Sequence, residues 1–408
     1  MGNKRVPEVR FEGFSGEWEE RKLGEVSYDF EYGLNASATQ YDGENKYIRI
    51  TDIDDTTHKF LEDSLTSPNI DLASAEKYLL KVGDILFART GASVGKTYIY
   101  DNKDGKVYYA GFLIRARIKS GYDPGFVFQN TLTTKYNEFI KITSQRSGQP
   151  GVNAQEYANF SIMVPSIDEQ QTIGNFFKQL DDTIALHQQE LTALKQTKQG
   201  FLQKMFPKEG ESVPEVRFPG FSGDWLPRKL SSMTTYKNGK GHEDRQSELG
   251  KYELINLNSI SINGGLKHSG KFVDESSEIL KKDDLVMVLS DVGHGDLLGR
   301  VALIPENDKF VLNQRVALLR PNDSADPLFL LSYINHDQKY FKSQGAGMSQ
   351  LNISRGSVEN FESLVPCLKE QTQIGTFFKQ LDDTIALHQR EVDALKETKK
   401  AFLQKMFV

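Results

Sequence analysis

The strongest constraint on this chain is that it is written twice. Residues 6–23, VPEVRFEGFSGEWEERKL, recur as residues 213–230 with 14 of 18 positions identical, and residues 169–206 recur as residues 370–407 with 29 of 38 identical. The segments between them, residues 24–168 and 231–369, share only scattered similarity. Drift after an old gene duplication would spread differences evenly along the chain. Here the repeated segments, which we call the frame, are nearly identical, and the inserts between them differ strongly. We infer that the two copies of the frame have the same role and that the two inserts have different roles. The two copies are about 200 residues apart, which is much longer than the ~20–50 residues of a solenoid repeat.

The repeat predicts the domain organisation. We expect a repeat segment, a variable domain and a long helix, and then the same three parts again. The predicted boundaries are 1–23, 24–165, 166–206, 207–230 (linker and second repeat segment), 231–366 and 367–408. The predicted fold class is α+β: two mixed α/β domains separated by two long antiparallel helices, which form a coiled coil about a pseudo-twofold axis.

Residues 167–206 read as one long helix. Ser166 and Glu169 form a capping-box pattern after Pro165, and Pro207 ends the helix. At 1.5 Å per residue, the helix would span roughly 60 Å. The second copy has Cys367 at the position of Ser166, so we expect its N-terminus to fray more.

Apolar residues spaced alternately by four and three positions form a heptad seam along each helix. The predicted seam residues are Ile173, Phe177, Leu180, Ile184, His187, Leu191 and Leu194, and in the second copy Ile374, Phe378, Leu381, Ile385, His388, Val392 and Leu395. Each apolar stripe needs a partner, and the other copy is the obvious candidate. The seam histidines, with Lys198 and Lys399, either lie at the seam edge, where lysine reaches water, or fix the register of the pair.

Composition narrows the class of protein. The chain has 408 residues, 50 Lys and Arg against 56 Asp and Glu, and a single cysteine, Cys367. A disulfide framework is therefore excluded, and no run is apolar enough for a membrane span or a signal peptide, so we expect a cytoplasmic protein without a membrane partner. Because proteins that wrap nucleic acid unaided usually carry a basic excess, DNA binding here would depend on local charge and on partners.

The first insert carries a local basic excess. Residues 86–119 contain seven Lys and Arg against two Asp, and include the tight loop RTGASVGKT at 89–97. Such a loop suits phosphate contacts and one base contact, and the QRSGQPGVN stretch at 145–153 gathers side chains that pair bidentately with purines. The alternative is an exposed polar loop. The predicted DNA-binding residues of this domain are Arg89, Thr90, Ser93, Lys96, Thr97, Gln145, Arg146, Gln149 and Asn153.

The second insert carries different chemistry at similar places. SDVGHG at 290–295 replaces the first loop, and GAGMSQLN at 345–352 stands where the second polar stretch was. If both domains read bases, they should read different bases. The predicted DNA-binding residues here are Ser290, Asp291, His294, Arg300, Gln344, Ser349, Gln350 and Asn352.

We find no catalytic constellation and no metal site in the sequence. GASVGKT at 91–97 has three residues between its glycines where a phosphate-binding P-loop needs four. The seven histidines and one cysteine show no metal-ligand spacing, and no Gly-x-Ser-x-Gly elbow is present.

The paired LDDTIALHQ helices, the paired VPEVRF-x-GFSG segments, the divergent inserts and the GDILFARTGASVGK stretch at 83–96 together resemble the specificity (S, or HsdS) subunit of type I restriction-modification enzymes. The resemblance implies a non-catalytic subunit whose two target recognition domains read a split, asymmetric sequence in double-stranded DNA. It also implies partners: two methyltransferase (M) subunits, which use S-adenosylmethionine, and two restriction/translocase (R) subunits, which use ATP and Mg. No cofactor would be bound by this chain.

Two other classes stay open at this point. A structural adaptor could use the helices to space two protein-binding domains, and an enzyme with an undetected site comes third. Salt-dependent retention on duplex DNA and a methyl-transfer assay on the isolated chain would separate them.

Overall fold

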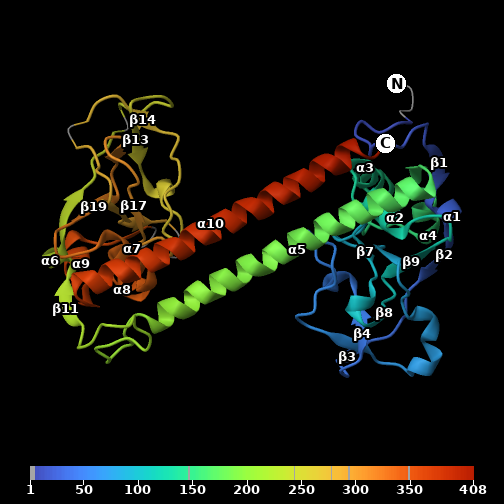
Figure 1. Cartoon of the computed structure of the whole chain (residues 1–408), viewed down its shortest axis with the longest axis horizontal. Coiled ribbons are helices and arrows are strands. Elements are labelled where there is room, and N and C mark those ends of the chain that lie inside the picture. Colours follow the sequence, from blue (N-terminus) through green and yellow to red (C-terminus); the bar gives the residue numbers. More distant parts are fainter. Residues whose placement is uncertain (1–4, 146–147, 243, 277, 293–294, 348–349) are drawn as a thin grey trace. The chain divides into compact units, whose positions relative to one another are not determined.

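The computed structural model describes residues 5–145, 148–242, 244–276, 278–292, 295–347 and 350–408. The chain divides into two compact units (Figure 1). Unit 1 contains residues 1–189 and 390–408, and unit 2 contains residues 190–389. The long helices α5 (Ile167–Lys204) and α10 (Leu368–Lys405) each contribute to both units. Among the described residues, no helix has the length and apolar character that a membrane span needs.

Unit 1 is built on a four-stranded antiparallel sheet in the order β2-β9-β6-β7. Its central strand β6 is wholly buried, as its apolar sequence ILFA requires. Before α5, the elements are β1 (Glu19–Lys22), α1 (Leu23–Val26), β2 (Ser27–Tyr32), β3 (Ala38–Gln40), β4 (Asn45–Ile48), η1 (Ile50–Asp52), β5 (Thr66–Pro68), η2 (Leu72–Ser74), η3 (Glu76–Tyr78), β6 (Ile85–Ala88), β7 (Thr97–Ile99), η4 (Asn102–Asp104), β8 (Lys106–Tyr109), β9 (Leu113–Ile118), α2 (Pro124–Asn130), α3 (Thr134–Thr143), α4 (Ala154–Ala158) and β10 (Ser161–Val164).

Unit 2 repeats this plan with the sheet β12-β19-β15-β17. Between α5 and α10 lie β11 (Leu226–Lys229), α6 (Leu230–Met233), β12 (Thr234–Asn238), β13 (Tyr252–Ile255), η5 (Leu257–Ser259), β14 (Phe272–Val273), β15 (Leu285–Val288), β16 (Ser290–Asp291), β17 (Val301–Leu303), β18 (Phe310–Leu312), β19 (Val316–Pro321), α7 (Pro327–His336), α8 (Gln338–Ser343), β20 (Leu351–Asn352), α9 (Arg355–Glu359) and β21 (Glu362–Val365). Each unit also has one parallel pair, β4 with β8 and β13 with β18. The mixed helix and strand content confirms the predicted α+β class.

The short repeated segments, residues 6–23 and 213–230, bind the start of a long helix in the same way in each unit. In unit 1, Arg10 makes a bidentate ion pair with the buried Glu169 on α5, through Nε and Nη2 at 2.7 Å each. In unit 2, Arg217 pairs with the buried Glu370 on α10 at 2.6 and 2.7 Å. The adjoining tryptophans, Trp18 and Trp225, are buried in the two cores. The kept frame is therefore a structural device that anchors a long helix to a domain.

The start of α5 differs in part from its prediction. The Glu169 N–H donates to the Ser166 hydroxyl at 3.4 Å, so the serine caps the helix as expected. The Glu169 side chain, however, pairs with Arg10 rather than completing a capping box, because the ion pair gives its buried carboxylate two charged donors. At the start of α10 the backbone carbonyl of Cys367 accepts from the N–H groups of Glu370 and Gln371 at 3.0 Å. The greater fraying of α10 stays a prediction.

Within each unit, the beginning of one long helix runs antiparallel to the end of the other. In unit 1, Phe176 meets Phe402 edge-on at 5.1 Å between ring centroids, and in unit 2 Phe201 meets Phe377 at 5.1 Å. The first two seam positions of each helix, Ile173 and Phe177 or Ile374 and Phe378, belong to the domain cores. The helix ends thus serve as core elements as well, and the coiled coil along the whole of both helices stays a prediction.

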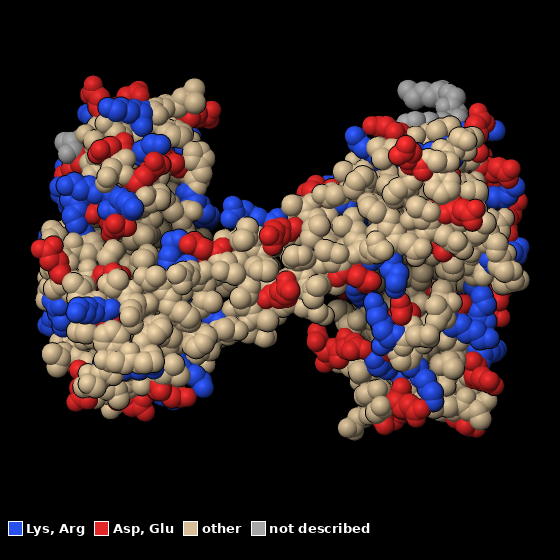
Figure 2. Space-filling view, viewed as in Figure 1, with Lys and Arg blue, Asp and Glu red and all other residues tan. Residues whose placement is uncertain are grey.

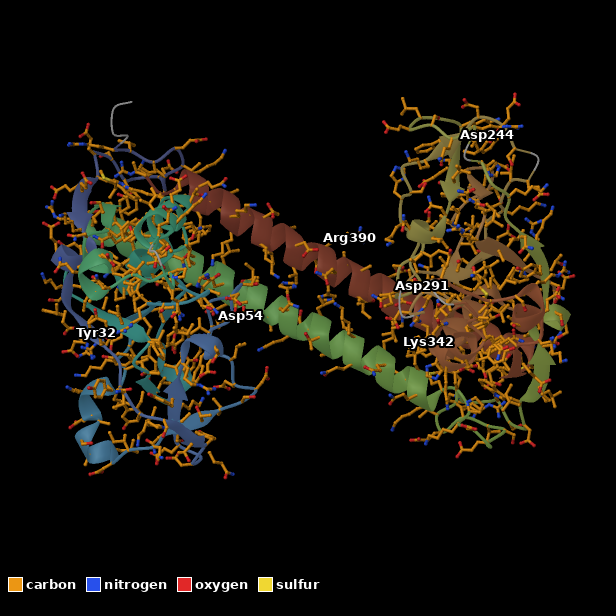
Figure 3. All side chains as sticks on the ribbon, turned by 180° about the vertical axis from the view of Figure 1, so that it is seen from behind. Tyr32, Asp54, Asp244, Asp291, Lys342 and Arg390 are labelled. Atoms are coloured by element: carbon orange, nitrogen blue, oxygen red, sulfur yellow. The ribbon has the colours of Figure 1, made fainter. Side chains whose placement is uncertain are left out.

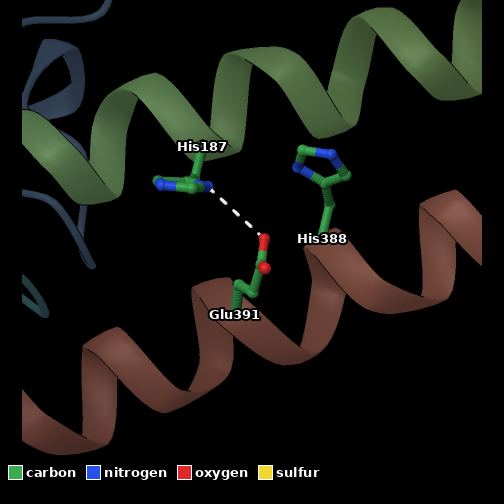
Figure 4. A group of neighbouring side chains, drawn as sticks. All are labelled: His187, His388 and Glu391. Atoms are coloured by element: carbon green, nitrogen blue, oxygen red, sulfur yellow. Dashed lines mark ion pairs between the residues drawn. The ribbon is translucent and has the colours of Figure 1, made fainter.

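The polar seam residues have acidic partners on the facing helix. In unit 1, Lys399 lies 2.6 Å from Asp181, and the His187 ring nitrogen lies 3.7 Å from the Glu391 carboxylate (Figure 4). In unit 2, Lys198 lies 2.5 Å from Asp382, and His388 lies 3.8 Å from Glu190. These pairs favour the interpretation that the polar residues fix the register, since each requires one alignment of the two helices.

Candidate nucleic-acid interface

The two polar stretches predicted in the first insert meet at one end of the unit 1 sheet. The Val152 N–H donates to the Arg89 carbonyl at 2.9 Å, and the Gly91 N–H donates to the Pro150 carbonyl at 3.0 Å. A β-bridge joins Thr90 to Gly151. The loop at 89–97 and residues 150–152 of the second stretch therefore meet, although 47 residues, 98–144, lie between the two stretches in the sequence.

Arg89 is held between two aromatic rings on this surface. Its guanidinium carbon lies 5.0 Å from the ring centroid of Tyr32 and 5.9 Å from that of Phe112. Both rings are exposed, Tyr32 to 44% and Phe112 to 60%. Stacking on aromatic faces restricts a guanidinium while leaving its N–H donors directed outward. Figure 3 labels Tyr32 at this position. Neither ring was predicted, because the contact joins strand ends that no local pattern relates.

Two predicted residues of this loop point into the domain. Thr97 is fully buried, and its hydroxyl lies 2.8 Å from that of Thr131. The Lys96 ammonium donates to the Ile53 carbonyl at 2.9 Å and pairs with Asp55, and its side chain is only 9% exposed. Both side chains are used inside the domain, which argues against the prediction that they contact DNA.

Two arginines of the basic excess at 86–119 are also bound by acidic side chains within unit 1. Arg115 is buried and pairs with Asp29 and Glu31 at 3.0 and 2.8 Å. Arg117 makes a bidentate bond to the buried Asp84 at 2.9 and 2.7 Å. These acidic partners hold the arginines against neighbouring strands. Part of the excess seen in the sequence is thus used in structural ion pairs, whereas Lys103 and Lys106 are exposed. Figure 2 shows blue and red side chains interspersed over the visible face of each unit.

The other predicted residues of unit 1 divide by environment. Gln145 and Gln149 are exposed, whereas Thr90 and Ser93 are half-buried, with the Thr90 hydroxyl 3.4 Å from the Pro150 carbonyl. Asn153 is exposed but caps α4, accepting the Glu156 N–H at 3.0 Å. Arg146 lies outside the described residues.

In unit 2 the corresponding segments meet as the two-stranded sheet β16-β20. Ser290 lies opposite Asn352 and Asp291 lies opposite Leu351. The buried Ser290 hydroxyl donates to the Asn352 side-chain oxygen at 2.7 Å, and the Gln350 amide bonds to the same hydroxyl. Asp291, labelled in Figure 3, accepts the Leu297 N–H at 3.2 Å. Ser290 is therefore an internal support, and Asn352 is the exposed member of the group.

Arg300, also predicted to contact DNA, is turned toward α7. Its Nη1 donates to the Asn335 carbonyl at 2.8 Å, and burial lowers the pKa of its guanidinium. The half-buried side chain holds the end of α7, so in this structure it is a structural residue. Gln344 follows α8 and is exposed, while His294 and Ser349 lie outside the described residues.

The two halves of this chain also match one known domain. A model of the type I restriction modification DNA specificity domain matches residues 15–196 and again residues 222–397. The chain belongs to this family. The resemblance inferred from the repeated segments is therefore confirmed, and the match covers each half of the internal repeat once.

Individual relatives agree over nearly the whole length. The chain is 22% identical to the putative type I restriction enzyme MjaX specificity subunit of Methanocaldococcus jannaschii, over 95% of this chain and 92% of the relative. It is 21% identical to the type I restriction enzyme MjaVIII specificity subunit of the same organism, over 85% and 83%.

Solved structures show the same fold. The type I restriction-modification S subunit from M. genitalium superposes with a TM-score of 0.70 at 15% identity, over 99% of both chains. A chain from a type I R-M system, studied for its complex assembly and conformational transition, gives 0.51 at 17% identity, over 95% and 97%. The fold of this chain is therefore shared with solved structures.

Proposed function

We propose that this chain is the non-catalytic specificity subunit of a type I restriction-modification complex, and that each unit reads one half of a bipartite, asymmetric DNA target. One observation carries the proposal. The two units share sheet order, frame ion pairs and loop pairing, yet they differ in the side chains at the end of the sheet. A scaffold built twice with two different surfaces suits a target with two different halves.

We further propose that the helices set the spacing of the half-sites and dock two methyltransferase subunits. Each helix is continuous for 38 residues, or roughly 57 Å at 1.5 Å per residue. Methyl transfer from S-adenosylmethionine to a flipped adenine would occur in those partners, and ATP- and Mg-dependent cleavage in two restriction subunits. This chain would bind none of these cofactors. The mixed surface charge agrees with a division of labour in which partners supply much of the phosphate contact.

The decisive experiment expresses the chain with its cognate methyltransferase subunit in a host that lacks adenine methylation, followed by genome-wide mapping of methyladenine. We expect a single split motif, methylated once on each strand and with a fixed gap. Absence of new methylation, from a complex shown to assemble by size-exclusion chromatography, would contradict the proposal and favour a protein-binding adaptor.

A second experiment separates the recognition surfaces from the frame. Q149A changes an exposed side chain of unit 1 and should relax only one half of the motif. Ile184→Asp places a charge at a buried helix position and should disturb both halves together. Relaxation of both halves by Q149A would refute independent reading by the two units.

A further inference from the structure

Strand register shows which residues of the two units correspond where β6 ends beside β9 and where β15 ends beside β19. Ala88 of β6 pairs with Leu113 of β9, and Val288 of β15 pairs with Val316 of β19. Directly beyond these pairs, the Arg89 N–H donates to the Phe112 carbonyl at 3.0 Å. In unit 2 the Leu289 N–H donates to the Arg315 carbonyl at 2.9 Å.

By this register, Leu289 stands at the place of Arg89, and Arg315 stands at the place of Phe112. Both units thus present one arginine and one apolar side chain from neighbouring strand ends, with the two exchanged. The simple sequence comparison, which set Ser290 and Asp291 against the Arg89 loop, missed this exchange. That comparison followed the chain from β15 to Ser290 and Asp291, whereas Arg315 directly precedes the neighbouring strand β19.

Arg315 has the features of a residue kept for its side chain. It is exposed, and its backbone φ of +65° lies in the left-handed region, which is unfavourable for a residue with a Cβ. Glycine or asparagine would occupy this turn at lower cost. Within the part of the chain that the structure describes, no carboxylate forms an ion pair with Arg315. Other described arginines, such as Arg117 and Arg320, each bind a carboxylate.

The surroundings of Arg315 also suit a nucleic acid. The exposed Gln314 precedes it, and the Leu289 carbonyl accepts the Ile353 N–H at 2.9 Å, which places the strand carrying Asn352 beside the same strand end. Arginine recognises guanine O6 and N7 in the major groove, and asparagine or glutamine recognises adenine. The group therefore combines the side chains that direct base reading uses.

We propose that Arg315 is the base-reading arginine of unit 2 and contacts a guanine in the half-site read by this unit, in the role that the proposed function gives to Arg89 in unit 1. The inference rests on the proposed function, since it assigns a residue to the reading of one half-site. It places the two reading arginines on different strand ends, so the two units approach their half-sites with different geometry.

The test uses the full chain in complex with its methyltransferase subunit, with methyladenine mapped genome-wide. The main variant is R315G, which removes the guanidinium and suits the left-handed backbone, so unfolding should not become easier. We expect discrimination at one guanine of one half-site to fall by roughly 10-fold or more, with the other half-site unchanged. R315K keeps the charge but loses the bidentate fork, and should not restore discrimination.

Two controls keep the outcomes distinct. K309A removes one positive charge at the opposite end of β18, where Lys309 pairs with Glu306 at 3.2 Å, and it should leave the motif unchanged. R89A should relax the other half-site. If R315G leaves a normal split motif, the assignment of Arg315 is wrong while the proposed function stands. If the unsubstituted complex yields no split motif, the proposed function itself fails.

Discussion

Units 1 and 2 are most alike where they meet their own helices and least alike at the far ends of their sheets. The frame ion pairs agree within 0.1 Å, Arg10 with Glu169 at 2.7 Å and Arg217 with Glu370 at 2.6 and 2.7 Å. At the sheet ends, by contrast, the Arg and the apolar residue exchange strands between the units. The ion pair is the same in both units because a buried carboxylate needs a charged partner, whereas a solvent-facing turn accepts many side chains.

The largest expected effect comes from breaking the frame. R10A and R217A each leave a buried carboxylate without its charged partner, which costs about 3–5 kcal/mol in the free energy of unfolding. Thermal and urea unfolding should show equal losses for the two variants. The exposed pair Arg5–Glu17 is the control, and R5A should cost less than about 1 kcal/mol. Markedly unequal losses would mean that the two anchors are not equivalent.

A second comparison concerns the glycine that follows the first sheet strand of each unit. A Cβ would lie 2.2 Å from the Ala110 carbonyl oxygen at Gly33, and 1.8 Å from the Asn313 carbonyl oxygen at Gly239. Alanine at either place forces the backbone apart, so G33A and G239A should each cost about 1–3 kcal/mol in unfolding free energy. G148A, with nothing near its Cβ, should change little. An unchanged unfolding free energy for G239A would show that the backbone around Gly239 and Asn313 can move apart at little cost.

A smaller effect sharpens the comparison of the two long helices. Gly200 of α5 corresponds to Ala401 of α10, and the space around it is open. G200A should stabilise the chain by about 0.5–1 kcal/mol, because alanine loses less backbone entropy than glycine in a helix. Urea unfolding measures the gain. The reverse change, A401G, should lose a similar amount, and a destabilising G200A would contradict the open surroundings of Gly200.

The smallest effect is a pH dependence in unit 1. Burial lowers the pKa of His58 below its ordinary 6.5, while its ring nitrogen lies 2.9 Å from the Thr97 carbonyl. Below about pH 6.5 the unfolded chain takes up a proton that folded His58 resists, so stability falls as the pH falls. H58N keeps a residue suited to the positive φ of 55° and should make the melting temperature fall less steeply with acid. An unchanged slope would exclude His58 as a source.

Some features of this protein followed from the sequence alone. The internal repeat established two copies of one plan, and the periodicity placed the long helices within a few residues of Ile167–Lys204 and Leu368–Lys405. The loop at 89–97 and the stretch at 145–153 were both identified as polar surface elements. The helix placement succeeds because capping and helical periodicity act between near neighbours in the chain, whereas the part that the two polar stretches play in DNA binding stays a prediction.

Tertiary structure decided which of the chosen side chains face outward. Lys96, Thr97 and Arg115 look alike as polar or basic residues, but their partners Ile53, Thr131 and Asp29 come from distant segments. The same holds for Arg89 between two rings, and for Arg315, whose equivalence to Phe112 appears only in strand register. Burial and cross-strand neighbours depend on where remote segments pack, and no local pattern in the sequence carries that information.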